Sequence, residues 1–364
     1  DVVIIPSQAD YATLEGILRT RGAKTTLEER RHFARRAFAV SSHYDSAIFT
    51  YFDGEDHSEL RLSAQSAKPL RYGENPHQQG IFYGELEKYF EQLHGKELSY
   101  NNLQDVEAAV SLIQDFDEPT FAILKHNNAC GCASRTTILE AWEAALAGDP
   151  VSAFGGVLVA NRPIDLQTAE EINKLFFEVL IAPDFTAEAL PVLESKKNRI
   201  LLRQLQPVSA QWSYRSMLGG VLAQETDRAV ETIQDMKPVT KVAPTAQELE
   251  DLVFATKLVK HSKSNAIVLG KAGQLIASGV GQTSRVDALK QAIEKARHFG
   301  FELKGAVLAS DAFFPFDDCV TLAAEAGITA IAQPGGSVRD EDSIKAADAH
   351  GIAMVMTGVR HFKH

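Results

Sequence analysis

The stretch Lys125-His126-Asn127-Asn128 concentrates side chains that could do chemistry. An ammonium, an imidazole and two carboxamides follow one another directly. A lysine beside a histidine can bring a proton donor or electrophile and a base to one substrate. The other interpretation is a solvated turn after an edge strand, and these four residues alone leave both open.

Short elements around this stretch would position it. Four apolar residues, Phe121 to Leu124, predict a buried strand. A strand that ends in polar residues puts them at the carboxyl edge of a sheet, where open α/β sheets bind ligands. Predicted strands and helices alternate along the chain, which favours α/β layers. A second Lys-His pair, Lys260-His261, precedes another predicted strand and hints at internal duplication.

Three further segments have residues suited to binding anions or rings. The loop from Leu70 to Gln79 carries an Arg-Tyr pair that could grip a phosphate. The segment from Ser152 to Gly156 could bring a backbone close to a ligand, or it could simply be a tight turn that leads into the next strand. The segment from Gly279 to Arg285 joins a strand to a helix, an anion-binding arrangement. It nearly matches a dinucleotide fingerprint, but Ser284 stands where the third glycine belongs.

Other candidates have structural alternatives. Asn102 or Asp105 could cap the helix in which they lie. The segment from Ala312 to Asp318, with three phenylalanines around a proline, could form an aromatic wall for a flat ligand or pack in the core. The last residues, Arg360 to His364, could fray or be tied into a site.

Two stretches of the chain are less regular in the sequence. Val2 to Ile5 predict a strand, and Thr26 to Glu29 is a capping-box pattern that begins a long helix. This first part, to about residue 55, is too small to close a core of its own. Residues from about Asn198 to Ala243 are weakly patterned, and Gly219-Gly220 and the segment from Pro238 to Pro244 are predicted as connectors.

Composition excludes several classes of protein. The 364 residues are 45% hydrophobic and 23% charged, as in soluble globular proteins. A net charge of -11 disfavours nonspecific binding to nucleic acid, and no apolar run approaches a membrane span. Three cysteines, an odd and sparse set, indicate a reducing compartment, so we expect the cytoplasm.

Zinc is not predicted. His126, Cys130 and Cys132 are near neighbours, but their spacing fits no structural zinc pattern and lacks a second Cys-x-x-Cys half.

Several motifs together closely resemble one family, the transformylase part of the bifunctional purine biosynthesis protein, which formylates 5-aminoimidazole-4-carboxamide ribonucleotide. They stand in family order from about residue 60 to the end. The motifs are LRYGENPHQQ from Leu70, LSYNNLQD from Leu98, Lys125-His126, SAFGGV from Ser152, SNAIV from Ser264, GQTSR from Gly281, SDAFFPF from Ser310, QPGGSVRD from Gln333 and the terminal RHFKH.

The resemblance implies a fold and a domain plan. Family members have two α/β/α units of the cytidine-deaminase type and pair as homodimers with the active site near the interface. Residues 56–225 and 226–364 would be these units. Residues 1–55 resemble only the closing segment of the family's inosine monophosphate cyclohydrolase unit, so cyclohydrolase activity is not expected. The zinc motifs of the deaminases are absent from this sequence.

The resemblance also implies a reaction with 10-formyltetrahydrofolate as co-substrate. The formyl group would pass to the 5-amino group of the ribonucleotide. His126 would take the proton of the amine, and Asn265 would hold the ring of His126. Lys125 would stabilise the oxyanion or assist the leaving nitrogen. The nucleotide would contact Arg71, Tyr72, Asn102, Gly155, Glu178, Arg285, Arg360, Phe362 and His364. The folate pocket would be lined by Phe154, Phe313, Pro315, Phe316 and Asp318.

Two positions depart from the family pattern. Ala129 stands where proline is frequent, which should change the stiffness of the loop. Asp317 stands where arginine is frequent, which changes the charge on the expected folate side. The sequence leaves open whether a monovalent cation orders the loop from Ser262 to Ser264.

Two other functions compete with formyl transfer. A nucleotide-dependent oxidoreductase could use the turn from Gly279 to Arg285, but it needs an acidic ribose ligand about 20 residues further on, where only Glu302 stands. A non-catalytic nucleotide-binding remnant would have lost activity, but it would have no need of Lys125, His126 and Asn265.

Overall fold

The computed structural model describes residues 2–364. The chain divides into two compact units, the first ending at Glu85 and the second running from Leu86 to His364. No helix among the described residues is long and apolar enough to cross a membrane. The boundaries expected at residues 55 and 225 stay predictions.

The first unit is mostly helical. Its elements are η1 (Gln8–Asp10), α1 (Tyr11–Arg21), α2 (Leu27–Asp53), β1 (Ala67–Leu70) and β2 (Gly80–Tyr83). Helix α2 begins at the predicted capping box, in which Thr26 and Glu29 bond each other's backbone N–H. Among residues 2–85 the buried apolar side chain is Phe33, so the prediction that this part closes no core is confirmed. The strand predicted at Val2 to Ile5 is wrong, because no described strand pairs with this segment.

The second unit is built on a twelve-stranded sheet. Its strand order is β11-β16-β15-β14-β12-β13-β5-β4-β6-β7-β8-β3. The strands are β3 (Phe90–His94), β4 (Thr120–Lys125), β5 (Asn128–Ser134), β6 (Val157–Ala160), β7 (Val179–Ala182), β8 (Ile200–Gln204), β11 (Lys237–Pro238), β12 (Ile267–Lys271), β13 (Gln274–Gly279), β14 (Val307–Ser310), β15 (Ala330–Gln333) and β16 (Ala353–Met356).

The sheet is the same pattern twice. In each half an antiparallel hairpin is followed by strands that run antiparallel, parallel and parallel, with a last antiparallel strand at the edge. The halves join where β13 pairs antiparallel with β5, at Gln274 and Ala133. This repetition confirms the two similar α/β/α units.

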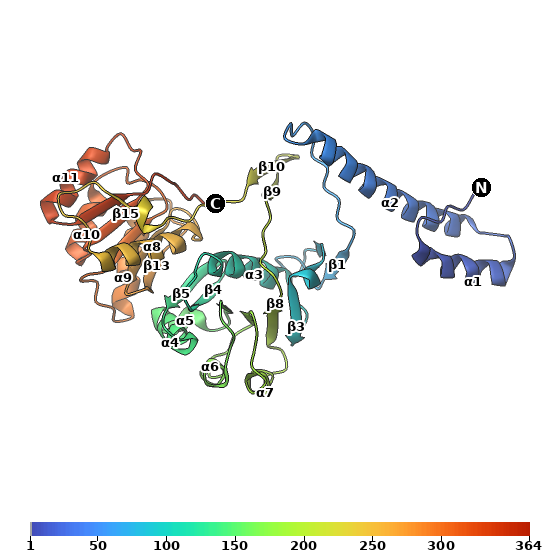
Figure 1. Ribbon diagram of the computed structural model, residues 1–364, viewed down its shortest axis with the longest axis horizontal. Helices are drawn as coiled ribbons and strands as arrows, with labels where there is room; N and C mark the ends of the chain where they lie inside the picture. Colours follow the sequence, from blue (N-terminus) through green and yellow to red (C-terminus); the bar gives the residue numbers. More distant parts are fainter. Residues whose placement is uncertain (1) are drawn as a thin grey trace. The chain divides into compact units, whose positions relative to one another are not determined.

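Helices cover both faces of the sheet. They are α3 (Tyr100–Ile113), α4 (Ile138–Gly148), α5 (Pro150–Ala153), α6 (Leu166–Ile172) and α7 (Ala189–Leu193) in the first half, and α8 (Ala246–Lys260), α9 (Arg285–His298), α10 (Asp318–Ala326) and α11 (Asp340–His350) in the second, with η2 (Leu86–Lys88) and η3 (Ile233–Asp235) as short turns. In the first half, α3 lies on one side of the strands and α6 and α7 on the other (Figure 1).

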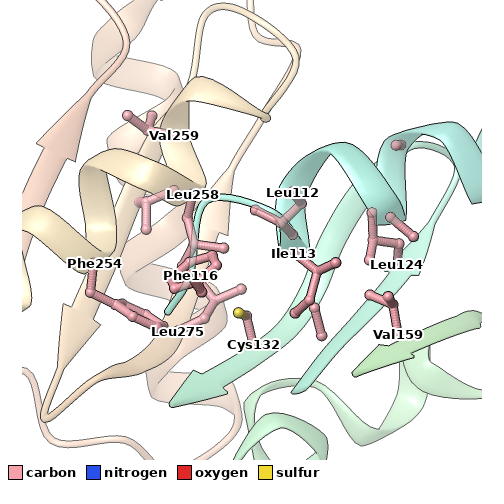
Figure 2. Close-up of a cluster of buried hydrophobic side chains, with 14 of the residues drawn as sticks. Leu112, Ile113, Phe116, Leu124, Cys132, Val159, Phe254, Leu258, Val259 and Leu275 are labelled. Atoms are coloured by element: carbon pink, nitrogen blue, oxygen red, sulfur yellow. The ribbon is translucent and has the colours of Figure 1, made fainter. Parts of the chain in front are cut away.

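One core is shared by the two halves. Leu112 of α3 and Leu258 of α8 are buried in the same cluster, and the rings of Phe116 and Phe254 lie 5.5 Å apart within it (Figure 2). The opposite face carries a separate cluster under α4, α6 and α7 and another under α9, α10 and α11. The α3–α8 layer therefore holds the halves together by burying apolar surface that spans both.

The two Lys-His pairs that hinted at duplication are not equivalent. Lys125-His126 lies at the turn between β4 and β5, whose counterpart between β12 and β13 is Ala272-Gly273. Lys260-His261 lies at the end of α8, whose counterpart is the end of α3. The duplication is confirmed, but it comes from strand topology and not from this repeated pair.

The weakly patterned stretch from about Asn198 to Ala243 contains strands, namely β8 and an isolated hairpin of β9 (Trp212–Met217) and β10 (Gly220–Glu225). The two connectors predicted in and beside this stretch are confirmed, since Gly219-Gly220 lies at the hairpin turn and residues 239–244 form no helix or strand. Both strands of the hairpin are largely exposed, with Leu218 fully so at the turn. Because neither face is buried, the sequence lacks the alternation that marks a half-buried strand.

Candidate active site

The turn between β4 and β5 carries the predicted chemistry. Strand β4 ends at Lys125 and β5 begins at Asn128. The two residues between them, His126 and Asn127, have φ angles of 53° and 65°. Positive φ at both central residues is typical of the tightest hairpin turns, and Asn and His tolerate it better than most residues. The predicted strand ending in a polar turn is confirmed.

Asp105 of α3 holds this turn. Its Oδ1 accepts a hydrogen bond from the backbone N–H of Asn127 at 2.7 Å. Burial raises the pKa of Asp105, although the bond from Asn127 and the nearby His126 act to lower it. The interpretation of Asp105 as a cap is wrong: Ser99 caps α3, and Asn102 is the partner whose Oδ1 accepts from Ser99.

Asn128 joins the turn to the second half of the sheet. Its Nδ2 donates to the carbonyl of His126 at 2.9 Å, and its Oδ1 accepts from the backbone N–H of Lys263 at 3.0 Å. Lys263 lies two residues before Asn265 on the loop that enters β12. The turn with Lys125 and His126 and the loop with Asn265 therefore adjoin.

Asn265 is fixed by a buried ion pair. Its Oδ1 accepts from Arg285 Nη2 at 2.9 Å and its Nδ2 donates to the carbonyl of Thr283 at 3.3 Å. Arg285 in turn pairs with Asp311, which is fully buried, and bonds Ser310 Oγ at 2.9 Å. The Nδ2 of an asparagine has two N–H groups, so one remains to donate to a histidine ring. No hydrogen bond joins Asn265 to the His126 ring among residues 2–364.

Lys125 points to the segment predicted to bring a backbone near a ligand. Its Nζ donates to the carbonyl of Phe154 at 2.8 Å. Gly155 has a φ of 74° and donates its N–H to the carbonyl of Phe176 at 2.8 Å. The Phe154 side chain is 59% exposed, with its ring 5.1 Å from that of Phe176. The ammonium of Lys125 and the exposed ring of Phe154 therefore lie close together.

Glu178 lies at the start of β7. Its Oε2 forms an ion pair with Lys96 Nζ at 2.6 Å. Its backbone N–H bonds the carbonyl of Gly156, which ties it to the segment with Phe154 and Gly155.

The aromatic segment after β14 divides between core and surface. Phe314 is fully buried, whereas Phe313 is half-buried and Phe316 is 50% exposed. The guanidinium of Arg339 lies 5.1 Å from the centre of the Phe316 ring. Pro315 and Asp318 are exposed, and Asp318 accepts a bond from the Cys319 N–H at 2.8 Å. The core-packing interpretation is therefore confirmed for Phe314, whereas an aromatic wall formed by Phe313 and Phe316 stays a prediction.

The last residues are tied to the loop of Asn265. The backbone N–H of Ser264 donates to the carbonyl of Lys363 at 2.9 Å, and the N–H of Lys363 donates back to Ser264 Oγ at 3.1 Å. The Phe362 ring lies 4.5 Å from the guanidinium of Arg360 and 5.3 Å from the ring of His364. The interpretation of this segment as tied down is confirmed.

Arg71 and Tyr72 belong to the first unit. The Arg71 guanidinium lies 5.6 Å from the centre of the Tyr72 ring. The loop around them is closed by a bond from the Gly73 N–H to the Gln78 carbonyl at 2.7 Å. Within that unit the loop is ordered by its own backbone.

The cysteines do not form a metal site. A bulge opposite Ile123 and Leu124 places Cys130 in the core cluster on one face of the sheet and Cys132 in the cluster on the other. Burial raises the pKa of Cys130 to about 12 and also raises that of Cys132, so both stay as thiols. Within residues 2–364 no group of three or more His, Cys, Asp and Glu could hold a metal.

The near-fingerprint of the rival oxidoreductase lies in an unsuitable topology. Strand β13 before Gly279 is one arm of an antiparallel hairpin, and the strand after α9 pairs with the other arm, β12. A dinucleotide-binding unit needs a parallel βαβ arrangement. Gly279 serves packing, since a Cβ there would lie 1.8 Å from the carbonyl oxygen of Ala288.

Two residues that organise this site have no functional role predicted from the sequence. They are Asp105 and Asp311. Both lie inside motifs that carry the family resemblance, LSYNNLQD and SDAFFPF, which is the available signal. Each acts through another residue's backbone or charge, which residue type alone does not reveal.

Comparisons with known proteins identify relatives over the whole chain. The family model "AICARFT/IMPCHase bienzyme" matches residues 1–295. The "Bifunctional purine biosynthesis protein PurH" of Bacteroides thetaiotaomicron is 62% identical over 364 residues, which is 100% of this chain and 72% of that protein. The protein of the same name from Acetivibrio thermocellus is 50% identical over 380 aligned positions, 100% of this chain and 73% of that one.

A solved structure from Thermotoga maritima also matches part of the chain. It is titled a diaminohydroxyphosphoribosylaminopyrimidine deaminase/5-amino-6-(5-phosphoribosylamino)uracil reductase. It covers 30% of this chain and 34% of its own at 25% identity, with a TM-score of 0.22. A likeness of that size does not bear on fold or function.

Proposed function

Since the chain belongs to the AICARFT/IMPCHase bienzyme family of purine-biosynthesis enzymes, we propose that it carries the transformylase reaction of that family. The formyl group of 10-formyltetrahydrofolate would pass to the 5-amino group of 5-aminoimidazole-4-carboxamide ribonucleotide. We propose further that residues 1–55 are the end of a cyclohydrolase unit and do not carry that second activity themselves.

The observation that supports this proposal most is the pair of bonds made by Asn128. They join the Lys125-His126 turn to the loop of Asn265. A cation, an imidazole and a carboxamide from two halves of the sheet thus come to one edge, beside the exposed ring of Phe154. Acyl transfer between two bound molecules needs such a base, a donor to the oxyanion and a surface for a flat co-substrate.

In the proposed reaction, one proton passes from the amine to the folate nitrogen through His126. The amine nitrogen attacks the formyl carbon, and His126 takes the proton that the amine loses. Lys125 donates to the formyl oxygen while it carries negative charge. The bond from carbon to the folate nitrogen then breaks, and that nitrogen takes up one proton from the imidazolium. Asn265 would hold the imidazole with the N–H that Arg285 and Thr283 leave available.

Different residues would bind the two substrates. The exposed or half-buried rings Phe154, Phe313 and Phe316, with Pro315 and Asp318, would receive the folate. The nucleotide would contact Arg71 and Tyr72. It would also contact residues near the turn and in the last segment, namely Asn102, Gly155, Glu178, Arg285, Arg360, Phe362 and His364. A homodimer with its site near the interface, and a cytoplasmic location, are further parts of the proposal.

Holding both substrates in line would contribute more than the acid–base pair. Positioning alone can supply roughly 7–11 kcal/mol of a barrier in well-oriented intramolecular reactions. An acid–base pair typically adds about 10²- to 10⁴-fold.

The test follows the formyl group itself. The purified chain is mixed with the ribonucleotide and 10-formyltetrahydrofolate labelled in the formyl carbon. The assay is run in potassium buffer and in a buffer with a large organic cation, which also tests whether transfer needs a small monovalent cation. Label in the ribonucleotide product, dependent on both substrates, supports the proposal. Binding of the ribonucleotide without transfer would support a non-catalytic protein instead. Inosine monophosphate is measured separately, and we expect it to be absent.

A further inference from the structure

The side chain of His361 lies between two carboxylates. Its Nδ1 is 2.6 Å from Asp227 Oδ2 and its Nε2 is 2.7 Å from Glu231 Oε1. The ring is buried, and Glu231 is buried with it, with 4% of its side chain exposed. Asp227 and Glu231 lie on the segment between β10 and η3, far from His361 in sequence.

This geometry requires a charged ring. A neutral imidazole has one N–H and one lone pair, so one of its nitrogens would face a carboxylate oxygen without a hydrogen between them. An imidazolium donates to both. Burial of the ring lowers its pKa, but the bonds to Asp227 and Glu231 outweigh burial and raise the pKa of His361 to about 9.

The backbone of His361 is bound to the network behind Asn265. Its N–H donates to the carbonyl of Asp311 at 3.0 Å. The Asp311 carboxylate pairs with Arg285 and also accepts from Ser264 Oγ. The final segment after β16 forms no helix or strand, so such bonds are what fix it.

We propose that His361 is a positioning residue that locks the final segment, residues 357–364, against the Asp227–Glu231 segment. The lock holds Arg360, Phe362 and His364 where the ribonucleotide binds. Because the bridge is made by a double donor, a side chain that donates to only one carboxylate does not replace it. The catalytic consequence rests on the proposed formyl transfer, whereas the lock itself does not.

The lock is tested without any reaction by hydrogen exchange of the full chain. In His361→Gln, both side-chain N–H groups are on one nitrogen, so the residue cannot reproduce donors at the separate positions of Nδ1 and Nε2. The backbone amides of Ser264, residue 361 and Lys363 should then exchange at least about tenfold faster, as expected for a loss near 1.4 kcal/mol. Amides of α4 and β6 should exchange as before. The exposed His350 at the end of α11 supplies the control, His350→Gln. Unchanged exchange in the final segment of His361→Gln, or equal acceleration everywhere, would overturn the lock.

The positioning role is tested by comparing the two substrates. His361→Gln should raise KM for the ribonucleotide about tenfold while KM for the folate changes less than about twofold. Glu231→Gln should act in the same direction, and the double variant should cost less than the sum of the two single ones, because the bridge is already lost. Equal changes in both KM values would overturn the role. If the wild-type chain transfers no formyl group, the proposed function fails, and ribonucleotide binding by calorimetry then decides in place of KM.

Discussion

The carboxylate of Asp105 accepts a hydrogen bond from the backbone N–H of Asn127, with 2.7 Å between Oδ1 and N. This bond fixes a helix on one face of the sheet to the turn that carries His126. Both central residues of that turn have positive φ. A turn of this conformation is held by its surroundings, so Asp105 helps to fix the position of the His126 imidazole.

Replacing Asp105 should lower turnover without unfolding the protein. Asp105→Ala removes the acceptor of the Asn127 N–H, a net loss of about 0.5–1.5 kcal/mol, and kcat should fall by up to roughly tenfold. Asp105→Asn keeps an oxygen acceptor and should stay within about twofold. The measurement is kcat at saturation with both substrates. A loss in Asp105→Asn as large as in Asp105→Ala would mean that the charge near His126 matters more than the bond.

Stability should depend on pH through His361. The folded pKa is raised to about 9, above the ordinary value of 6.5. The stabilisation is therefore fully present below pH 6.5 and is lost as pH rises from 6.5 to 9. His261 acts oppositely: burial lowers its pKa despite its bond to Asp115, so its contribution is lost as pH falls.

Comparing the wild type with His361→Gln separates the contribution of His361 to stability from that of His261. Denaturant unfolding of the wild type and of His361→Gln is measured from pH 6 to pH 9.5. The difference in free energy of unfolding between the two should shrink with rising pH, since the contribution of His261 is common to both. A difference that is constant across this range would contradict a charged His361.

The Arg285–Asp311 pair should be costly to break. Both side chains are buried, so Arg285→Leu leaves the Asp311 carboxylate uncompensated at a cost of about 3–5 kcal/mol. The exposed pair of Lys345 and Glu341 is the control, and Lys345→Ala should cost less than about 0.5 kcal/mol. Urea unfolding gives both values. Similar losses for the two variants would refute the importance assigned to the buried pair.

Two strand glycines, one in each half of the sheet, should resist substitution. A Cβ on Gly131 would lie 2.1 Å from the Ala145 carbonyl oxygen, and one on Gly279 would lie 1.8 Å from that of Ala288. Gly131→Ala and Gly279→Ala should therefore lower the melting temperature, because strand and helix must separate. Gly16, which has open space around it in α1, is the control, and Gly16→Ala should not destabilise the protein. Equal melting temperatures for all three would contradict the packing.

Arg71 separates nucleotide binding from folate binding. If its guanidinium holds the ribonucleotide phosphate, Arg71→Ala should raise the nucleotide KM by about tenfold or more and leave the folate KM nearly unchanged. Steady-state kinetics with each substrate varied in turn decides this. The same rise in both KM values would argue against a phosphate ligand.

Much of the second unit was predictable because its elements follow simple periodicities. The buried strands at Phe121 and Val179 are short apolar runs, and α9 has one apolar face, so each was recognised. Strand β5 was missed because Asn128 to Ser134 is rich in small residues, and its bulge breaks the alternation of faces. The sheet order was beyond reach, since pairing between distant strands leaves no local signal.

The members of the candidate site come from the sequence, but the bonds that connect them do not. Motifs that stand far apart in the sequence predict Lys125, His126 and Asn265. The turn and the loop are joined by a bond between Asn128 and Lys263. Lys263 contributes only its backbone N–H, which every residue except proline has, so its residue type gives no signal. The two carboxylates at His361 were equally hidden, because Asp227 and Glu231 lie in a segment without periodicity.

The most direct test of the account compares tetrahydrofolate release by the wild-type chain and by His126→Asn, each saturated with both substrates. Asparagine tolerates the positive φ of this turn and cannot act as a base at neutral pH. We expect the wild type to release tetrahydrofolate only when the ribonucleotide is present. We expect the variant to be slower by about 10²- to 10⁴-fold with ribonucleotide binding preserved. Near-normal release by His126→Asn would mean that this turn does not supply the base for formyl transfer.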